Sequence, residues 1–331
     1  MNTVPEYDPA APLLFVINAA AGSRDTTSKR ALIEAALHDG GRSGELLVCQ
    51  PGDLARVSQA AARRSLALRS AVVAVGGDGT LNTVAQAAHT AGCVMGVLPQ
   101  GTFNYFARTH GIAADPPEAM RQLLHGVPVP VQVAAVNERV FLVNASLGLY
   151  PELLEDREAY KARFGRSRWV AFWAAAVTLL RAQRQLRLHI EQGASVRDVR
   201  ALTLFVGNNR LQLTQLGVPP PPTAQTDRTG APAVPCITAV MLQPIGTWAM
   251  LGLMLHGAMG TLGEAQGVER FDFSHMVVRP ALAPGRRSVK VAFDGEVTRL
   301  RAPLDFRVLA RPLYLLLAQP PHTALAVNGH G

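Results

Sequence analysis

The sequence predicts an N-terminal α/β domain with a parallel sheet, followed by a C-terminal antiparallel β-sandwich domain. Over roughly the first 136 residues, short apolar runs alternate with helical stretches, which indicates a parallel sheet covered by helices. From about residue 129 the pattern changes to many short strands separated by turn signals. The chain has 331 residues, 48% of them hydrophobic, which suits two cores and excludes a long disordered chain. We therefore expect domains at 1–136 and 137–318.

The elements follow from these two patterns. In the first domain we expect strands at 13–17, 45–49, 71–75 and 94–98, with helices at 27–38, 53–68, 81–90 and 115–124. Ala71–Val75 is apolar throughout, as expected of a strand buried on both faces. In the second domain we expect strands at 129–136, 140–147, 186–192, 199–206, 234–242, 275–279, 288–293 and 296–301, and helices near 167–184 and 245–262. The proline-rich stretch 219–235 predicts a loop.

The charge and the cysteine content of the chain indicate which class of partner and which cellular compartment to expect. The net charge of +8 favours an anionic partner, such as a lipid headgroup or a phosphorylated substrate. The basic residues are scattered without interleaved aromatic residues, which argues against nucleic acid. Cys49, Cys93 and Cys236 are widely spaced, so we expect free thiols in a reducing compartment. The first residues do not resemble a signal peptide, and 245–263 predicts an amphipathic helix rather than a membrane span.

A glycine-rich turn, Gly76-Gly-Asp-Gly-Thr80, follows the most apolar predicted strand. Glycines let the chain turn sharply and let a phosphate approach the backbone amides. We expect Thr80 to cap the next helix, so that free N–H groups face the same point. Asp78 would repel a bare phosphate, which favours a Mg²⁺ ion and its waters between them. The alternative is a tight strand-to-helix turn that merely contains an aspartate.

Two further turns follow predicted strands of the same domain. Gly101-Thr102 comes after 94–98, and Asn18-Ala-Ala-Ala-Gly22 comes after 13–17. In a parallel sheet the carboxyl ends of strands lie on one edge, where ligands bind. Arg24 is a candidate cation for a phosphate, or else an ordinary solvated side chain.

In the second domain, Asp294-Gly-Glu296 lies between two alternating strands. Asp-Gly at this position predicts a β-hairpin, which by itself carries no function. Glu296 adds a second carboxylate at the tip of the hairpin. One carboxylate could accept a proton from a hydroxyl while the other orients it.

Together these residues resemble the diacylglycerol kinase catalytic family, which includes bacterial lipid kinases and sphingosine kinases. The resemblance covers Gly76–Thr80, the segment Leu98–Asn104 with Phe106-Ala-Arg108, and Asp294–Glu296 ahead of Pro303-Leu304. Two shorter matches, Asn144–Gly148 and Gly207-Asn-Asn209, look like the strand ends that open the family's second domain.

The resemblance implies an ATP-dependent kinase of a lipid hydroxyl, with the nucleotide in a cleft between the two domains. It implies that Asp78 organises Mg²⁺ through water, and that Glu296 with Asp294 accepts the proton of the lipid hydroxyl. It also implies that the last strand, within 304–318, returns to the first domain. The nucleotide-binding residues that it implies are Asn18, Ala19, Ala20, Ala21, Gly22, Gly76, Gly77, Asp78, Gly79, Thr80, Leu81, Asn82, Thr83, Gly101, Thr102 and Asn104.

The sequence departs from the family at two positions. Tyr105 and Gln132 stand where the family often has acids of its metal–water network. A catalytically weakened nucleotide- or lipid-binding protein therefore stays open. A kinase of a soluble substrate such as NAD also stays open, because it would share the Gly-Gly-Asp-Gly-Thr turn. The second Gly-Thr turn and the late Asp-Gly-Glu favour the lipid.

A lipid substrate requires contact with a membrane surface. The apolar segment 169–180 has Arg166 and Arg168 before it and Arg181 and Arg184 after it, which suits an anionic interface or a core helix. We expect a cytoplasmic protein of phospholipid metabolism, peripheral at the membrane. The loop at 211–235 matches poorly with a segment that holds a structural metal in some relatives. A homodimer stays open.

Overall fold

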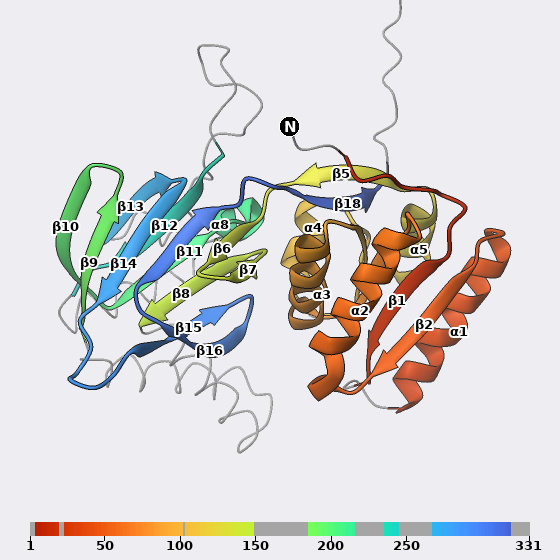
Figure 1. Cartoon of the computed structure of the whole chain (residues 1–331), viewed down its shortest axis with the longest axis horizontal. Helices are drawn as coiled ribbons and strands as arrows, with labels where there is room; N and C mark the ends of the chain where they lie inside the picture. Colours follow the sequence, from red (N-terminus) through yellow and green to blue (C-terminus); the bar gives the residue numbers. More distant parts are fainter. Residues whose placement is uncertain are drawn as a thin grey trace, which may run out of the picture. The chain divides into compact units, whose positions relative to one another are not determined.

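The structure, a computed structural model, describes residues 4–19, 23–101, 103–148, 185–215, 235–244 and 267–318 (Figure 1). It contains two compact units. One unit comprises the described parts of Met1–Val131 and Leu313–Gly331, and the other comprises those of Gln132–Pro312. The sequence placed the division after residue 136, whereas Ala134–Val136 belongs to a sheet of the second unit.

The first unit is built on a six-stranded sheet in the order β2-β1-β3-β4-β18-β5, counted over the described residues. Its strands are β1 (Leu13–Asn18), β2 (Gly44–Cys49), β3 (Ala71–Gly76), β4 (Val94–Pro99), β5 (Val127–Val131) and β18 (Leu313–Leu317). The first four strands are parallel to one another, as predicted, and β18 is parallel to β4. Every residue of β3 is buried, which confirms a strand covered on both faces.

One strand predicted at the edge of this sheet is wrong as a single element. We expected a strand over 129–136, but the structure has two strands there: β5 in the first unit and β6 (Ala134–Val136) in the second. β5 contains Pro128 and Pro130, which lack the N–H that a central strand must donate. It therefore lies at the edge of the sheet, where β18 is its one antiparallel partner among the described residues.

Helices cover both faces of this sheet. They are α1 (Ser23–Asp39), α2 (Leu54–Ala67), α3 (Asp78–Ala91), α4 (Tyr105–Thr109) and α5 (Pro116–Leu124), with a short 3₁₀ turn η2 (Pro51–Asp53) before α2. α2 packs against α3, and α1 packs against α5. No helix among the described residues is both long and apolar enough to cross a bilayer.

The second unit is a β-sandwich, as predicted, and all its pairings are antiparallel. One sheet has the order β10-β9-β14-β17-β6-β7 and the other β13-β12-β11-β8-β15-β16, within the described ranges. Apolar side chains of both sheets, such as Phe306 from one and Leu147 from the other, form one core. The remaining bounds are β7 (Arg139–Phe141), β8 (Asn144–Gly148), β9 (Leu186–Gln192), β10 (Ser195–Ala201), β11 (Thr203–Gly207), α8 (Arg210–Gln215), β12 (Ile237–Leu242), β13 (Val268–Phe273), β14 (His275–Pro280), β15 (Ser288–Phe293), β16 (Glu296–Arg301) and β17 (Leu304–Val308).

A predicted strand at 140–147 is also wrong as a single element. β7 and β8 belong to different sheets, and the chain crosses between them at Leu142 and Val143. The backbone N–H groups of these two residues donate to the Asp294 carboxylate instead of to a strand. Cys49, Cys93 and Cys236, all within the described residues, form no disulfide, as predicted. The predicted helices near 167–184 and 245–262, and the loop 219–235 apart from its last residue, lie outside the described residues.

Candidate functional site

The two glycine turns of the first unit lie against each other. Gly76, the last residue of β3, is the Cα partner of Pro99 in β4, and Gln100 N–H donates to the Gly76 carbonyl at 2.8 Å. A Cβ atom added to Gly101 would lie 3.1 Å from the Gly77 Cα atom. The two backbones thus meet at the carboxyl edge of the sheet, at a separation where a side chain on Gly101 would be crowded.

Asn104 closes the second turn. Its Oδ1 atom accepts from Gly101 N–H and its Nδ2 atom donates to the Gly101 carbonyl, both at 2.9 Å. Asn104 has φ 47°, a left-handed conformation that asparagine tolerates better than most residues. Thr102 lies outside the described residues, as do Ala20, Ala21 and Gly22.

The start of α3 differs from the prediction. Gly77, not Thr80, is the N-cap residue, and its backbone is extended. Thr80 is buried, and its hydroxyl accepts a hydrogen bond from Asn18 Nδ2 at 3.3 Å, so it ties β1 to the turn instead of capping the helix. The first intrahelical bond runs from Leu81 N–H to the Gly77 carbonyl. The N–H groups of Asp78, Gly79 and Thr80 precede it and belong to the positive end of the helix.

The other residues that were predicted to bind the nucleotide near this turn differ in burial and in hydrogen bonding. The Leu81 side chain is fully buried, and Asn82 is buried as well. The Thr83 hydroxyl donates to the Gly79 carbonyl at 3.0 Å. Ala19 directly follows β1, at the same sheet edge as Gly77. The side chain of Arg24 is not among the described ones.

Asp78 is the first residue of α3, and its carboxylate has an unusual environment. A backbone hydrogen bond from Asn104 favours its ionised form, but burial outweighs this bond and raises the pKa of the carboxyl. The Oδ1 atom is buried without a hydrogen-bond partner. Such an atom in a native protein calls for an explanation, such as an ion or a water.

A magnesium ion fits this arrangement if most of its ligands come from elsewhere. The described residues contain no group of three histidine, cysteine, aspartate or glutamate side chains close enough to hold a metal. Magnesium commonly takes one or two protein carboxylates and completes its shell with waters and substrate phosphates. Asp78 supplies one such carboxylate, beside amides that suit phosphate oxygens.

In the second unit, Asp294 is a structural anchor of the hairpin between β15 and β16. The residue is 5% exposed. Oδ1 accepts from the N–H groups of Val143 at 2.8 Å and Asn144 at 3.1 Å, and Oδ2 accepts from Leu142 N–H at 2.7 Å. Asp294 and Gly295 both have positive φ, as the predicted Asp-Gly hairpin requires. Glu296, the first residue of β16, is exposed.

The sequence analysis did not predict how Asp294 is held. Backbone N–H donors are common to nearly all residue types and leave no signal in the sequence. Leu142 and Val143 lie inside the single strand that the sequence predicted at 140–147, so the break that frees their N–H groups from the sheet was not predicted.

The two departures from the family have structural partners. Gln132 Nε2 donates to Asn208 Oδ1 at 2.8 Å and to the Cys236 carbonyl at 3.0 Å. Asn208 Nδ2 in turn donates to the Leu142 carbonyl at 3.1 Å, next to the Asp294 anchor. The Tyr105 ring stacks on Phe103, with 5.8 Å between ring centroids. Both positions therefore serve neutral packing and hydrogen bonding.

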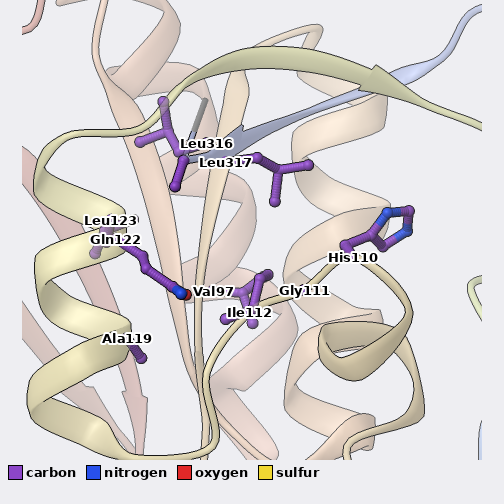
Figure 2. A pocket seen from close by; sticks show the side chains of 10 residues that line it. Val97, His110, Gly111, Ile112, Ala119, Gln122, Leu123, Leu316 and Leu317 are labelled. Carbon is purple, nitrogen blue, oxygen red and sulfur yellow. The ribbon is translucent and has the colours of Figure 1, made fainter. Parts of the chain in front are cut away.

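A pocket of about 180 Å³ elsewhere in the first unit does not suit a phosphate (Figure 2). It is lined by apolar side chains of β4, α5 and β18, such as Val97, Leu123 and Leu316, together with His110 and Gln122. The His110 ring packs edge-on against Phe106, and burial lowers its pKa to about 4. The lining thus carries no charge at neutral pH.

Comparison with known proteins points to one family. Residues 12–136 match the model of the diacylglycerol kinase catalytic domain. A Serratia proteamaculans protein named "Probable lipid kinase YegS-like" is 31% identical over 183 residues, which cover 53% of this chain and 58% of that protein. The Bacillus subtilis diacylglycerol kinase is 32% identical over 144 residues, which cover 42% of this chain and 46% of that protein.

A solved structure shows the same fold. The crystal structure of a diacylglycerol kinase from Bacillus anthracis superposes with a TM-score of 0.62 at 16% identity, covering 93% of this chain and 97% of that one. By sequence, the chain spans about half the length of the relatives that it matches.

Proposed function

Because residues 12–136 belong to the diacylglycerol kinase catalytic-domain family, we propose that this protein is an ATP-dependent lipid kinase. The observation that carries the proposal is the unpartnered, buried Oδ1 atom of Asp78 beside the closely apposed Gly77 and Gly101 turns. Phosphoryl transfer depends mainly on positioning and on neutralising charge. A buried carboxylate oxygen that lacks a partner and lies at a helix start supports a site for a cation with its phosphates.

On the donor side, the N–H groups at the start of α3 and the Gly101 turn would hold phosphate oxygens of ATP. The bond from Asn18 to Thr80 would keep β1 and α3 in register around them. Magnesium, when bound, would neutralise phosphate charge, and Asp78 would hold it through water. The predicted contacts of Ala20 to Gly22 and of Thr102 are part of the same proposal.

On the acceptor side, the proposed proton acceptor is Glu296. The lipid hydroxyl oxygen would form a bond to the γ-phosphorus while the bond to the β–γ bridging oxygen breaks, and the hydroxyl proton would pass to the Glu296 carboxylate. Asp294 would be a positioning residue, because three backbone N–H groups already occupy its two oxygens. The products would be a lipid phosphate monoester and ADP.

A nucleotide-binding protein without catalysis is the second candidate. It is favoured by the neutral roles of Gln132 and Tyr105, where acids of a metal–water network are often found in the family. It differs from the first candidate in one respect only: ATP would bind without losing its γ-phosphate.

The test is transfer of labelled γ-phosphate from ATP to an extracted lipid mixture in the presence of Mg²⁺, with NAD in a parallel reaction. A labelled lipid, identified by mass spectrometry, supports the lipid kinase. Labelled NADP would replace it with a soluble-substrate kinase. Binding of ATP with no labelled product would favour the second candidate.

A further inference from the structure

Five exposed arginines lie at one end of the sandwich of the second unit. They come from the start of β9, the end of β10, the connection between β14 and β15, and the end of β16. Figure 1 shows this connection at the end of the sandwich where β9 begins and β14 ends. The five exposed residues, here called the arginine cluster, are Arg187, Arg200, Arg286, Arg287 and Arg301.

Backbone pairing places two members of the cluster directly opposite each other. Arg187 of β9 is the Cα partner of Arg200 of β10. The Arg187 carbonyl accepts from Ala281 N–H at 2.8 Å, so the residue that follows β14 lies beside this pair. Like charges directly opposite each other destabilise a sheet, and an anionic partner would relieve that repulsion.

The other members lie at the far side of the same connection. The Arg287 carbonyl accepts from Ala302 N–H at 3.0 Å, which places Arg287 beside Arg301 at the end of β16. Residues 281–287 join this group to the pair on β9 and β10. The fold therefore brings together arginines that are scattered in the sequence.

The charge of the cluster is not neutralised within the described part of the chain. No described residue forms an ion pair with any of the five side chains. The acidic side chains of β9, β10 and β13 already contact other basic residues, namely Glu191 with Arg279, Asp198 with His189, Glu269 with Arg197, and Asp272 with Arg270. The cluster thus presents uncompensated positive charge to solvent.

The connection inside the cluster also carries a short uncharged loop. Residues 281–285 read Ala-Leu-Ala-Pro-Gly, and all of them except Leu282 are fully exposed. The loop is a tight turn, because Gly285 has φ 80° and Arg286 N–H donates to the Ala283 carbonyl at 3.0 Å. An apolar loop between cations suits a surface that has anionic groups outside and an apolar layer beneath them.

Two features favour a phospholipid bilayer over a nucleic acid. Single-stranded nucleic acids are bound through aromatic side chains that stack on the bases. Neither β9, β10 and β16 nor the segment 281–287 contains Phe, Tyr or Trp. Guanidinium groups form paired hydrogen bonds with phosphates, which phospholipid headgroups present in a plane.

We propose that the arginine cluster and the loop 281–285 dock this protein on an anionic phospholipid bilayer. The guanidinium groups bind lipid phosphates, and the loop contacts the first carbons of the acyl chains. Glu296 begins β16 and Arg301 ends it, roughly 17 Å apart at about 3.4 Å per residue. This surface is therefore separate from the proposed proton acceptor. The inference goes beyond the proposed function, since a bound anionic lipid need not be a substrate.

The test is sedimentation with vesicles of phosphatidylcholine, either alone or with one third phosphatidylglycerol, in the absence of ATP. Wild type should bind the anionic vesicles and not the neutral ones. A cation near an anionic surface contributes about 5-fold in affinity, so Arg286→Gln combined with Arg287→Gln should weaken binding by about 30-fold. Leu282→Ser should weaken it by about 5-fold without changing its salt dependence, because it removes apolar contact and no charge.

The matched control is Arg30→Gln combined with Arg63→Gln, which removes two exposed arginines from α1 and α2 of the first unit. It has the same net charge as the double variant of the cluster and should bind vesicles like wild type. Equal losses in the two double variants, or equal binding of wild type to both kinds of vesicle, would overturn the inference. If the cluster variant loses binding to a DNA duplex but not to vesicles, the partner is a nucleic acid and the bilayer inference is wrong. Because no ATP is present, failure of the kinase proposal would not change these outcomes.

Discussion

The two units each contain a turn built around an aspartate, and the two carboxylates are treated in opposite ways. Asp294 has both oxygens occupied by three backbone N–H groups. Asp78 has one backbone hydrogen bond from Asn104, a buried Oδ1 atom without a partner and a pKa raised by burial. Asp294 therefore stabilises the fold, whereas Asp78 keeps a buried carboxylate oxygen to which the described residues donate no hydrogen bond.

This difference shows how to separate structural acids from acids that await a ligand. In both turns a glycine directly follows the aspartate, so residue type alone does not distinguish the two acids. The hydrogen bonds that each carboxylate accepts do distinguish them. A buried carboxylate whose oxygens all accept hydrogen bonds contributes to stability, and one with an unbonded oxygen reduces it. The predictions below test that distinction.

The largest effect is expected at the exposed acid of the hairpin. Glu296→Gln removes the proposed proton acceptor but keeps the shape of the side chain, so turnover should fall by about 10²–10⁴-fold. ATP affinity should change little. Steady-state kinetics with a lipid acceptor and a separate ATP-binding titration measure the two quantities. Near-normal turnover would remove Glu296 from this role.

The next effect is expected at Asp78. Asp78→Asn removes the charge that would hold Mg²⁺, and turnover at saturating Mg²⁺ should fall by about 10²–10³-fold, the size seen when one transition-state electrostatic contact is lost. The same variant should fold at least as stably as wild type, because it removes a buried charge that lacks full compensation. A normal response to Mg²⁺ would contradict the assignment.

Substitution of Asp294 should reduce the stability of the fold, whereas substitution of Asp78 should not. Asp294→Ala leaves three buried N–H groups without an acceptor, so the free energy of unfolding should fall by about 3 kcal/mol. Urea unfolding followed by circular dichroism measures it. Asp305→Ala is the control: its carboxylate pairs with His275 and Arg307 at a partly exposed site, and its loss should amount to less than about 1 kcal/mol. Equal losses would refute the anchor role.

The smallest effect is a difference in pH dependence. Burial raises the pKa of Asp78 above 3.8, so the folded chain binds this proton more tightly than the unfolded chain. The contribution of Asp78 to stability is therefore most favourable below pH 3.8 and declines as the pH rises through the folded pKa. The stability of Asp78→Asn relative to wild type should thus increase with pH. A difference that is constant over this range, in unfolding curves at several pH values, would contradict the environment described for Asp78.

Much of the fold follows from the sequence, and the parts that do not have physical reasons. Apolar runs such as Ala71–Val75 predicted the parallel strands, and Asp294-Gly295 predicted the hairpin, because both signals are local. The place of β5 at the edge of the first sheet depends on its partner β18, which lies far along the chain. A local sequence pattern does not predict the pairing of two strands that lie so far apart in the chain.

The candidate site likewise has features that the sequence predicted and features that it did not. The sequence predicted that turns after β3 and β4 share one sheet edge, and Gly77 and Gly101 do lie together there. It assigned the cap of α3 to Thr80 from residue preference, whereas the structure uses the extended Gly77 and places Thr80 against Asn18. The anchoring of Asp294 depends on main-chain donors, which the sequence does not mark.

The most direct test of the contrast between the two acids is the affinity for ATP with and without Mg²⁺, measured by titration calorimetry on wild type, Asp78→Asn and Glu296→Gln. The account predicts that Mg²⁺ strengthens ATP binding to wild type and to Glu296→Gln, and that Asp78→Asn loses this gain. An equal gain in all three proteins would show that the open oxygen of Asp78 does not serve the metal.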